Sequence, residues 1–137
     1  MARVLCTVDH TRHAAEAVRA AIERCRRRGS ELDLVGVVAP FADAPSPAYG
    51  ERVRRFGLVQ ANLVRAARAA RRAGLNPAIA LRAGDPRAEA LAAARVLGAS
   101  EIVFADPGSL LRRGSEVVAV SVAGAGVGDR ERERLAA

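Results

Sequence analysis

Three residues that could hold a ligand come directly after short apolar runs of this chain. They are Asp9, Gly84 and Asp106. The apolar runs before them consist largely of aliphatic residues and end at a polar residue or a turn signal, which predicts buried β-strands. A carboxylate can bind polar groups, and a glycine lets a ligand approach the backbone closely. These positions are therefore the first candidates for a binding site.

Metal binding and nucleophilic catalysis have less support. Cys6 lies within a predicted strand and Cys25 on the apolar face of a predicted helix, where each is interpreted as a small buried hydrophobic residue. His10 and His13 could join them as ligands, but no tight Cys/His spacing indicates a metal site. No Ser-His-Asp or Cys-His arrangement stands in the context of a catalytic motif. We therefore expect neither a metal nor an enzyme.

Composition limits the partners. The chain has 137 residues, a formal net charge of +7 and no lysine among its basic residues. Arginine without lysine, together with abundant alanine, is typical of a GC-rich genome. The arginines are dispersed along the chain, and no aromatic residues alternate with them as stacking platforms for bases. Nucleic-acid binding is not the expected function, although an Arg-mediated binder of nucleic acid or another anionic partner remains an alternative.

The chain length fits one domain. Residues 1–123 are expected to form it, and residues 124–137 to form a flexible charged tail. The N-terminus has no signal-peptide pattern. The longest stretch of low charge, residues 117–128, is too short and too rich in glycine to cross a bilayer. A cytoplasmic protein without membrane contact is expected.

Strands and helices alternate in the predicted order. We expect strands at residues 4–8, 32–39, 77–83, 101–105 and 116–122, and helices in the three longest intervals between them. Thr11 is expected to cap the first helix and Gly29 to end it. The second helix should run over residues 47–73. Its inward face is expected to consist of Val53, Phe56, Gln60, Leu63, Ala67 and Ala70.

The alternation predicts an α/β fold, an open and mostly parallel five-stranded sheet with helices on both faces. Gly84-Asp85-Pro86 predicts a turn, a helix cap and a first helical residue in succession. In such a sheet, ligands bind beyond the carboxyl ends of the strands, where the strand order reverses. Asp9, Ala39, Gly84 and Asp106 lie at these ends.

The chain resembles the universal stress proteins. Residues 4–11 match the opening of that family, an apolar strand that ends in Asp-x-Ser/Thr. Val37-Val38 in the second strand, Gly84-Asp85-Pro86 after the third and residues 98–103 before the fourth match it in order and spacing. The resemblance covers nearly all of residues 3–122. It implies an adenine-nucleotide-binding type of α/β fold, and it also implies a regulatory role in stress.

Some members of the family bind ATP or AMP, and the resemblance implies which residues would do so here. Asp9 and Val38 would contact adenosine, and Gly84 would keep the floor of the pocket open. Arg112 could pair with phosphate. Gly114 and Ser115 resemble the close of the family's phosphate loop, Gly-x2-Gly-x9-Gly-Ser/Thr, although a helix stop is the competing interpretation of Gly114.

The phosphate loop is where this chain departs from the family. Asp106 stands in place of the first glycine and Ser109 in place of the second, and only four residues separate Ser109 from Gly114. Asp106 would repel phosphates by on the order of several kcal/mol at an intermediate dielectric. A Mg²⁺ ion between Asp106 and the phosphates, or Arg112 and Arg113, could offset this repulsion. Weak or lost nucleotide binding is expected, and no cofactor.

The same segment shortens the last connection. The family's fourth helix is expected to be short or missing, with a short helix at residues 107–113 as an alternative. A parallel crossover needs at least about ten to twelve residues, so the fifth strand can just return in parallel, as an edge strand. Exchange of this strand between the two copies of a dimer is the alternative arrangement.

An apolar strand at an edge needs a partner or a guard. The resemblance implies a homodimer through residues 116–122, with Val117, Val118, Val120 and Val122 at the interface. The function expected from the sequence is a non-enzymatic regulatory domain that acts through homodimerisation and contacts with a further protein partner. A nucleotide-responsive regulator of the same fold that binds ATP or AMP is the alternative.

Overall fold

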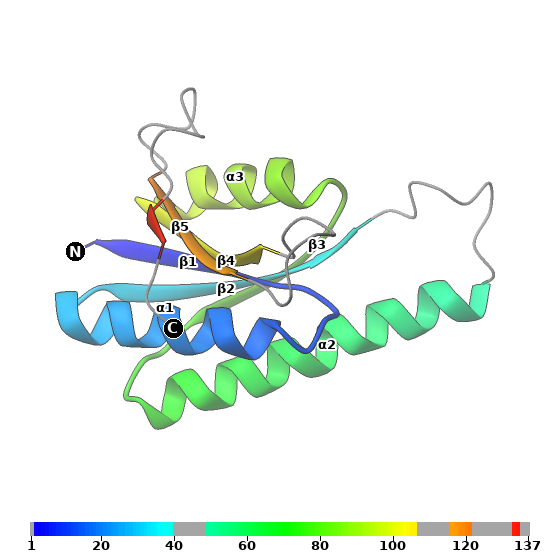
Figure 1. The fold of residues 1–137 in the computed structure, drawn as a ribbon, viewed down its shortest axis with the longest axis horizontal. Helices are drawn as coiled ribbons and strands as arrows, with labels where there is room; N and C mark the ends of the chain where they lie inside the picture. The colour runs from blue at the N-terminus through cyan, green and yellow to red at the C-terminus, as the bar shows by residue number, and fades with distance from the viewer. Residues whose placement is uncertain (1, 40–48, 107–115, 122–132, 135–137) are drawn as a thin grey trace.

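A computed structural model describes residues 2–39, 49–106, 116–121 and 133–134 of the chain, which fold around one sheet (Figure 1). The strands are β1 (Arg3–Val8), β2 (Glu31–Val38), β3 (Ala78–Ala83), β4 (Glu101–Asp106), β5 (Glu116–Ser121) and β6 (Glu133–Arg134). The helices are α1 (Ala14–Arg28), α2 (Tyr49–Arg72) and α3 (Pro86–Leu97). The strand order across the sheet is β3-β2-β1-β4-β5-β6. The predicted α/β class is confirmed.

The first four strands are parallel. β1 pairs with β2 on one side and β4 on the other, and β3 pairs with the far side of β2. Each of the three connections between these strands contains a helix, as parallel neighbours require. The strand order reverses between β1 and β4, so that their carboxyl ends form the expected binding edge.

The fifth strand does not return in parallel, so that prediction is wrong. β5 pairs with β4 antiparallel, with Glu116 opposite Asp106 and Ser121 opposite Glu101. Only residues 107–115 lie between the two strands, just under the lower limit of about ten to twelve residues for a parallel crossover, whereas antiparallel neighbours need no crossover. The short helix that was expected at residues 107–113 lies outside the described residues.

β5 is also not the last strand of the sheet. Residues 133–134, which fall in the expected charged tail, form β6 and pair antiparallel with Val118 and Ala119. The sheet therefore has six strands where five were expected. Because β6 pairs with only two residues of β5, it covers only part of the outer edge of that strand.

Helices cover both faces of the sheet, α1 and α2 on one and α3 on the other (Figure 1). Side chains of β1 and β2 alternate between two cores, as the period of a strand requires. The core under α1 and α2 includes Val4, Cys6, Val8, Leu32, Leu34, Leu63 and, from α1, Ala14, Ala17 and Ala21. The core under α3 includes Leu5, Val35, Val37, Ile102 and, from α3, Ala90, Ala93 and Ala94.

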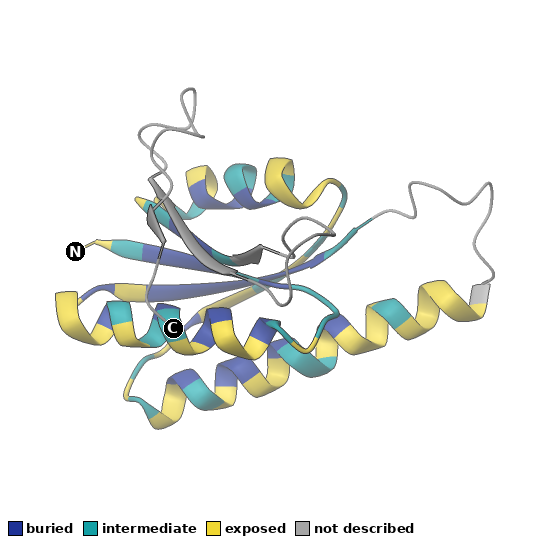
Figure 2. Ribbon diagram, in the orientation of Figure 1, coloured by how far each residue is buried: buried dark blue, intermediate teal, exposed yellow. Residues whose placement is uncertain are grey.

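The inward face of α2 differs from the prediction at its beginning. Leu63, Ala67 and Ala70 are buried as expected. Val53, Phe56 and Gln60, which were expected on the same face, are exposed. Figure 2 shows why, because the N-terminal half of α2 extends beyond the end of the sheet and is mostly exposed there. The period of a helix indicates which side is apolar, and it cannot indicate where the surface beneath the helix ends.

An ion-pair network joins β1 and β2 at the amino end of the sheet. Arg3 donates from Nε and Nη2 to the two carboxylate oxygens of Asp33, at 3.1 and 2.6 Å, and also pairs with Glu31. Asp33 is fully buried. The hydrogen bonds to Asp33 raise the pKa of Arg3 above its ordinary value. Arg3 therefore supplies the hydrogen bonds and the opposite charge that a buried carboxylate needs.

Candidate functional site

The parallel strands bring three sequence-predicted residues to one edge of the sheet. Asp9 follows β1, Val38 ends β2 and Gly84 follows β3. All three are partly buried. The N–H of Gly84 donates to the carbonyl oxygen of Val38 at 3.1 Å, so these two backbones are in direct contact. The edge that the sequence indicated is therefore assembled from the expected strand ends.

The Asp9 carboxylate is directed back to its own loop. Its Oδ1 accepts from the N–H of Thr11 at 2.9 Å and from the Thr11 hydroxyl at 2.7 Å. The Thr11 hydroxyl in turn accepts from the N–H of His13, which is the N-cap residue of α1. The prediction that Thr11 caps α1 is wrong, because this turn displaces the start of the helix to Ala14. One oxygen of Asp9 is therefore already engaged before any ligand arrives.

The side chain of Asn62, on α2, binds the backbone of the loop that contains Asp9 and Thr11. Its side-chain N–H₂ donates to the carbonyl oxygens of Asp9 and Thr11, at 2.9 and 3.0 Å, and its Oδ1 accepts from Arg65 at 3.2 Å. Sequence reasoning missed this residue. One feature of the sequence could have indicated it. An asparagine inside a helix competes with the backbone for hydrogen bonds, so its presence there suggests that its side chain has a partner elsewhere.

Gly84 has φ +143, a conformation that residues with a Cβ rarely adopt. A Cβ at this position would lie 2.8 Å from Oε1 of Glu89. Glu89 is held there because its other oxygen, Oε2, accepts from Nε of Arg82 at 2.6 Å. Glycine is therefore required here by the backbone and by the Arg82–Glu89 pair. No ligand is needed to explain it.

Two acidic residues end the β4–β5 pair at this same edge. Asp106 is the last residue of β4 and lies opposite Glu116, the first residue of β5. β4 is the neighbour of β1, and Asp9 directly follows β1. Two residues of acidic type at this strand end disfavour a phosphate there.

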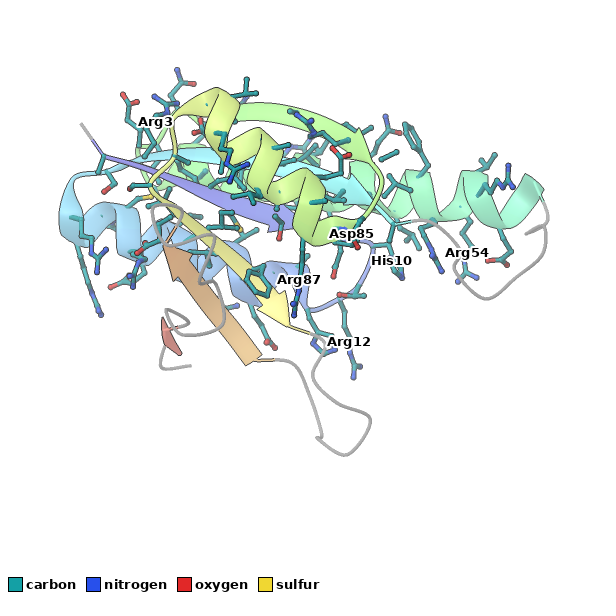
Figure 3. All side chains as sticks on the ribbon, turned by 90° about the horizontal axis from the view of Figure 1, so that it is seen from above. Arg3, His10, Arg12, Arg54, Asp85 and Arg87 are labelled. Carbon is teal, nitrogen blue, oxygen red and sulfur yellow. The ribbon has the colours of Figure 1, made fainter. Side chains whose placement is uncertain are left out.

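Positive charge is present at the edge as well. Figure 3 shows His10 and Arg12, from the loop after β1, and Asp85 and Arg87, from the beginning of α3, toward this end of the molecule, whereas Arg3 lies at the other. Asp85 accepts from the N–H of Ala88 at 3.0 Å and so acts as the predicted cap of α3, with Pro86 in the first turn. The surroundings of Asp9 thus carry charges of both signs.

The remaining predicted ligand residues, Arg112, Gly114 and Ser115, lie outside the described residues, as does Val122 of the predicted dimer interface. Val117, Val118 and Val120 belong to β5. Within the described residues, no group of three His, Cys, Asp or Glu residues could hold a metal ion. No helix in that part of the chain is long and apolar enough to span a membrane.

These positions fit an adenine nucleotide in part. The strand-end residues Asp9, Val38 and Gly84 occupy one edge, next to the point where the strand order reverses, which suits a nucleoside. The phosphate half fits poorly. β4 ends at Asp106, where a phosphate cradle would begin, and its antiparallel register partner in β5 is a second acidic residue, Glu116.

The comparisons agree with this fold. The model of the universal stress protein family matches residues 1–125. A member of that family from Burkholderia pseudomallei has 29% identity and a TM-score of 0.64 over 75% of this chain and 80% of its own. A universal stress protein from Archaeoglobus fulgidus has 20% identity and a TM-score of 0.61 over 83% of this chain and 81% of its own.

A third similar structure is a universal stress protein in complex with cAMP. It has 18% identity and a TM-score of 0.54, over 72% of this chain and 68% of its own. The comparison with curated proteins finds no match. Because the family model covers most of the chain, and the four parallel strands with their three helices agree with it, this chain belongs to the universal stress protein family.

Proposed function

We propose that this chain is a non-enzymatic regulatory domain of the cytoplasm that acts through homodimerisation and contacts with a protein partner, with nucleotide binding weak or lost. The observation that carries the proposal is the antiparallel pairing of β4 with β5, in which Asp106 lies opposite Glu116. It stands where the ATP-binding members of the family have a glycine-rich phosphate loop. Two acidic residues there favour the loss of phosphate affinity.

The state of Asp9 supports the same conclusion. A ligand that used both oxygens of this carboxylate would have to replace the two hydrogen bonds from Thr11. Each such bond contributes about 0.5–1.5 kcal/mol net, and those to a charged group contribute more. The free and buried thiols of Cys6 and Cys25 support a reducing compartment.

Dimerisation is proposed to use β5. Among the described residues, β6 pairs with Val118 and Ala119 only. In the part of the chain that the structure describes, no strand pairs with the outer backbone groups of the other positions of β5, and unpaired strand edges pair readily with a second copy. A partner strand would either extend along β5 beyond β6 or displace the two-residue β6.

Light scattering tests the dimer. The chain is expected to have the mass of a dimer at high micromolar concentration, and Val118→Lys and Val120→Lys are each expected to lower it toward a monomer, because a charge on the paired strand is costly to bury. Val96→Lys is the control, since Val96 is 79% exposed on α3. A monomer in the unsubstituted chain would contradict the proposal.

A nucleotide-responsive regulator is the second candidate. It is favoured by Arg12 and Arg87, which lie toward the same edge as Asp9 (Figure 3) and could pair with a phosphate. The similar universal stress protein in complex with cAMP favours it too. The two candidates differ in one measurable quantity, the affinity for an adenine nucleotide and its dependence on Asp9.

A further inference from the structure

An apolar groove lies between α2 and β3, on the edge of the sheet remote from β5. Its volume is about 720 Å³. Leu63 and Val64 of α2 form one wall, and Ile79 and Leu81 of β3 form the floor. Ile79 is 45% exposed and Val64 is 50% exposed. We call this surface, with Arg68 and Arg71 on its rim, the β3 ledge.

The ledge exists because α2 packs over β2 and leaves β3 uncovered. Gly36 of β2 is the cause, since a Cβ there would lie 2.9 Å from Val59 and 3.3 Å from Leu63, both of α2. Without a side chain at residue 36, the helix settles against β2. Leu81, the register partner of Gly36, then lies beside the helix and remains partly exposed.

β3 also presents an unpaired backbone. It is the outermost strand of the sheet, and among the described residues no strand pairs with its outer side. Natural edge strands are commonly protected by charged residues, bulges or prolines. The one charged residue of β3, Arg82, is paired with Glu89 of α3, so this edge has no unpaired charge of its own as a guard.

The charge around the ledge is positive. α2 carries seven arginines against one glutamate, while the formal net charge of the whole chain is +7. Arg68 and Arg71 are exposed at the groove, and neither makes an ion pair within the described residues. An occupant with carboxylates would therefore be attracted, and a basic one repelled.

A second copy of this chain is a poor occupant. Pairing of β3 with β3 of another copy would bring two such arginine-rich helices to the same interface, where like charges oppose association. The ledge instead suits an extended segment of a partner protein. The apolar residues would contact apolar side chains on one face of that segment, the arginines would attract acidic side chains beside them, and the unpaired backbone of β3 would pair with its backbone.

We propose that the β3 ledge docks an acidic, extended segment of a partner protein, which pairs as an added strand along β3. This inference rests on the proposed function in one respect, namely that the chain contacts a protein partner. It involves neither β5 nor Asp9, so the peptide experiment below can fail while the dimer measurement succeeds, and the reverse.

The test uses the full chain and a labelled peptide with blocked ends, followed by fluorescence anisotropy at low salt. On one face of the extended peptide, Val side chains are flanked by Glu side chains, and the other face carries Thr. Saturable binding is expected, and it should slow amide hydrogen exchange at residues 78–83. Added salt should weaken it. The same peptide with a central proline should not bind, because proline interrupts strand pairing.

Substitutions assign the binding to the ledge. Arg68→Glu combined with Arg71→Glu is expected to weaken binding roughly tenfold, as reversal of two exposed charges would. Ile79→Glu should abolish it. Arg95→Glu and Val96→Glu, at exposed positions of α3, are the matched controls and should leave it unchanged. Because Arg68 and Arg71 are exposed, their variant tests the proposal even if Ile79→Glu fails to fold.

Three results would overturn the proposal. One is equal binding of the same peptide with Arg in place of each Glu. Another is exchange protection that falls on β5 and leaves residues 78–83 unchanged. The third is a dimer of the unsubstituted chain that Ile79→Glu dissociates and Val118→Lys does not, since this would assign the ledge to a second copy.

Discussion

At the scale of single residues, the buried Asp33 accounts for the position of Arg3. A carboxylate without exposure is stabilised only if an opposite charge and hydrogen-bond donors reach it. Arg3 supplies both from β1, while its own side chain remains 30% exposed. Sequence reasoning interpreted the beginning of β1 as a simple apolar strand, and the partner 30 residues away cannot be seen in a local pattern.

Arg3→Ala is therefore expected to lower the free energy of unfolding by about 2–3 kcal/mol, below the about 3–5 kcal/mol for a fully buried pair because water can reach this one. Denaturant unfolding measures it. Arg27→Ala is the control, since its pair with Glu23 is exposed on α1 and should contribute less than about 0.5 kcal/mol. Equal effects of the two variants would contradict the role of Asp33.

The two thiols make a prediction about pH. Burial, helped by the charges of Glu101 and Asp33, raises the pKa of Cys25 from 9.0 to about 11, and burial also raises the pKa of Cys6. In the unfolded chain the thiols ionise at their ordinary pKa of 9.0, while in the folded chain they stay protonated to higher pH. The free energy of unfolding is therefore unaffected by the thiols below pH 9 and decreases as the pH rises toward 11. Unfolding by denaturant across this range measures the decline.

The variant with Cys6→Ala and Cys25→Ala is expected to flatten that alkaline decline, although it also lowers stability at neutral pH by removing buried atoms. An unchanged decline would show that other groups cause it. In the native protein, both thiols should resist a thiol reagent at neutral pH, because the thiolate is the reactive form and each sulfur is buried.

At the scale of elements, the beginning of α3 was predictable from three adjacent residues. Gly84, Asp85 and Pro86 act as turn, cap and first helical residue, as their types require. Local chemistry determines such a boundary. The beginning of α1 was not predictable in the same way, because Asp9 competes for Thr11 and the helix starts later.

Asp85→Ala is expected to lower the free energy of unfolding by about 1 kcal/mol, since the N–H of Ala88 loses its acceptor. Asp85→Asn keeps an acceptor and should restore most of the loss. Thermal or denaturant unfolding of both variants measures the difference. Two variants of equal stability would indicate that the cap bond contributes nothing.

Sequence reasoning predicted β5 but missed its direction. The spacing of residues 107–115 stood close to the lower limit for a crossover, and the resemblance to the family favoured the parallel choice. The antiparallel pairing with β4 satisfies the same backbone groups with a shorter connection. Spacing alone could not decide between the two, because both place β5 beside β4.

At the scale of the whole molecule, the sequence predicted which residues lie at the carboxyl ends of the parallel strands but not the contacts that they make. Asp9, Val38 and Gly84 lie at the ends of three neighbouring strands, as the alternation of strands and helices indicates, and that they bind a ligand stays a prediction. Asn62 binds the backbone of the Asp9 loop, and Glu89 lies beside Gly84. Both contacts depend on how separate elements pack together, which a local sequence pattern does not reveal. The same packing leaves the β3 ledge open at the other edge of the sheet.

Calorimetric titration with AMP, cAMP and ATP, each with and without Mg²⁺, shows whether the family's nucleotide site still functions in this chain. The variants are Asp9→Asn, which keeps an acceptor for Thr11, and Glu23→Gln as a control on the exposed face of α1. We predict no saturable heat up to millimolar nucleotide. Micromolar binding that Asp9→Asn abolishes and Glu23→Gln leaves intact would contradict this prediction.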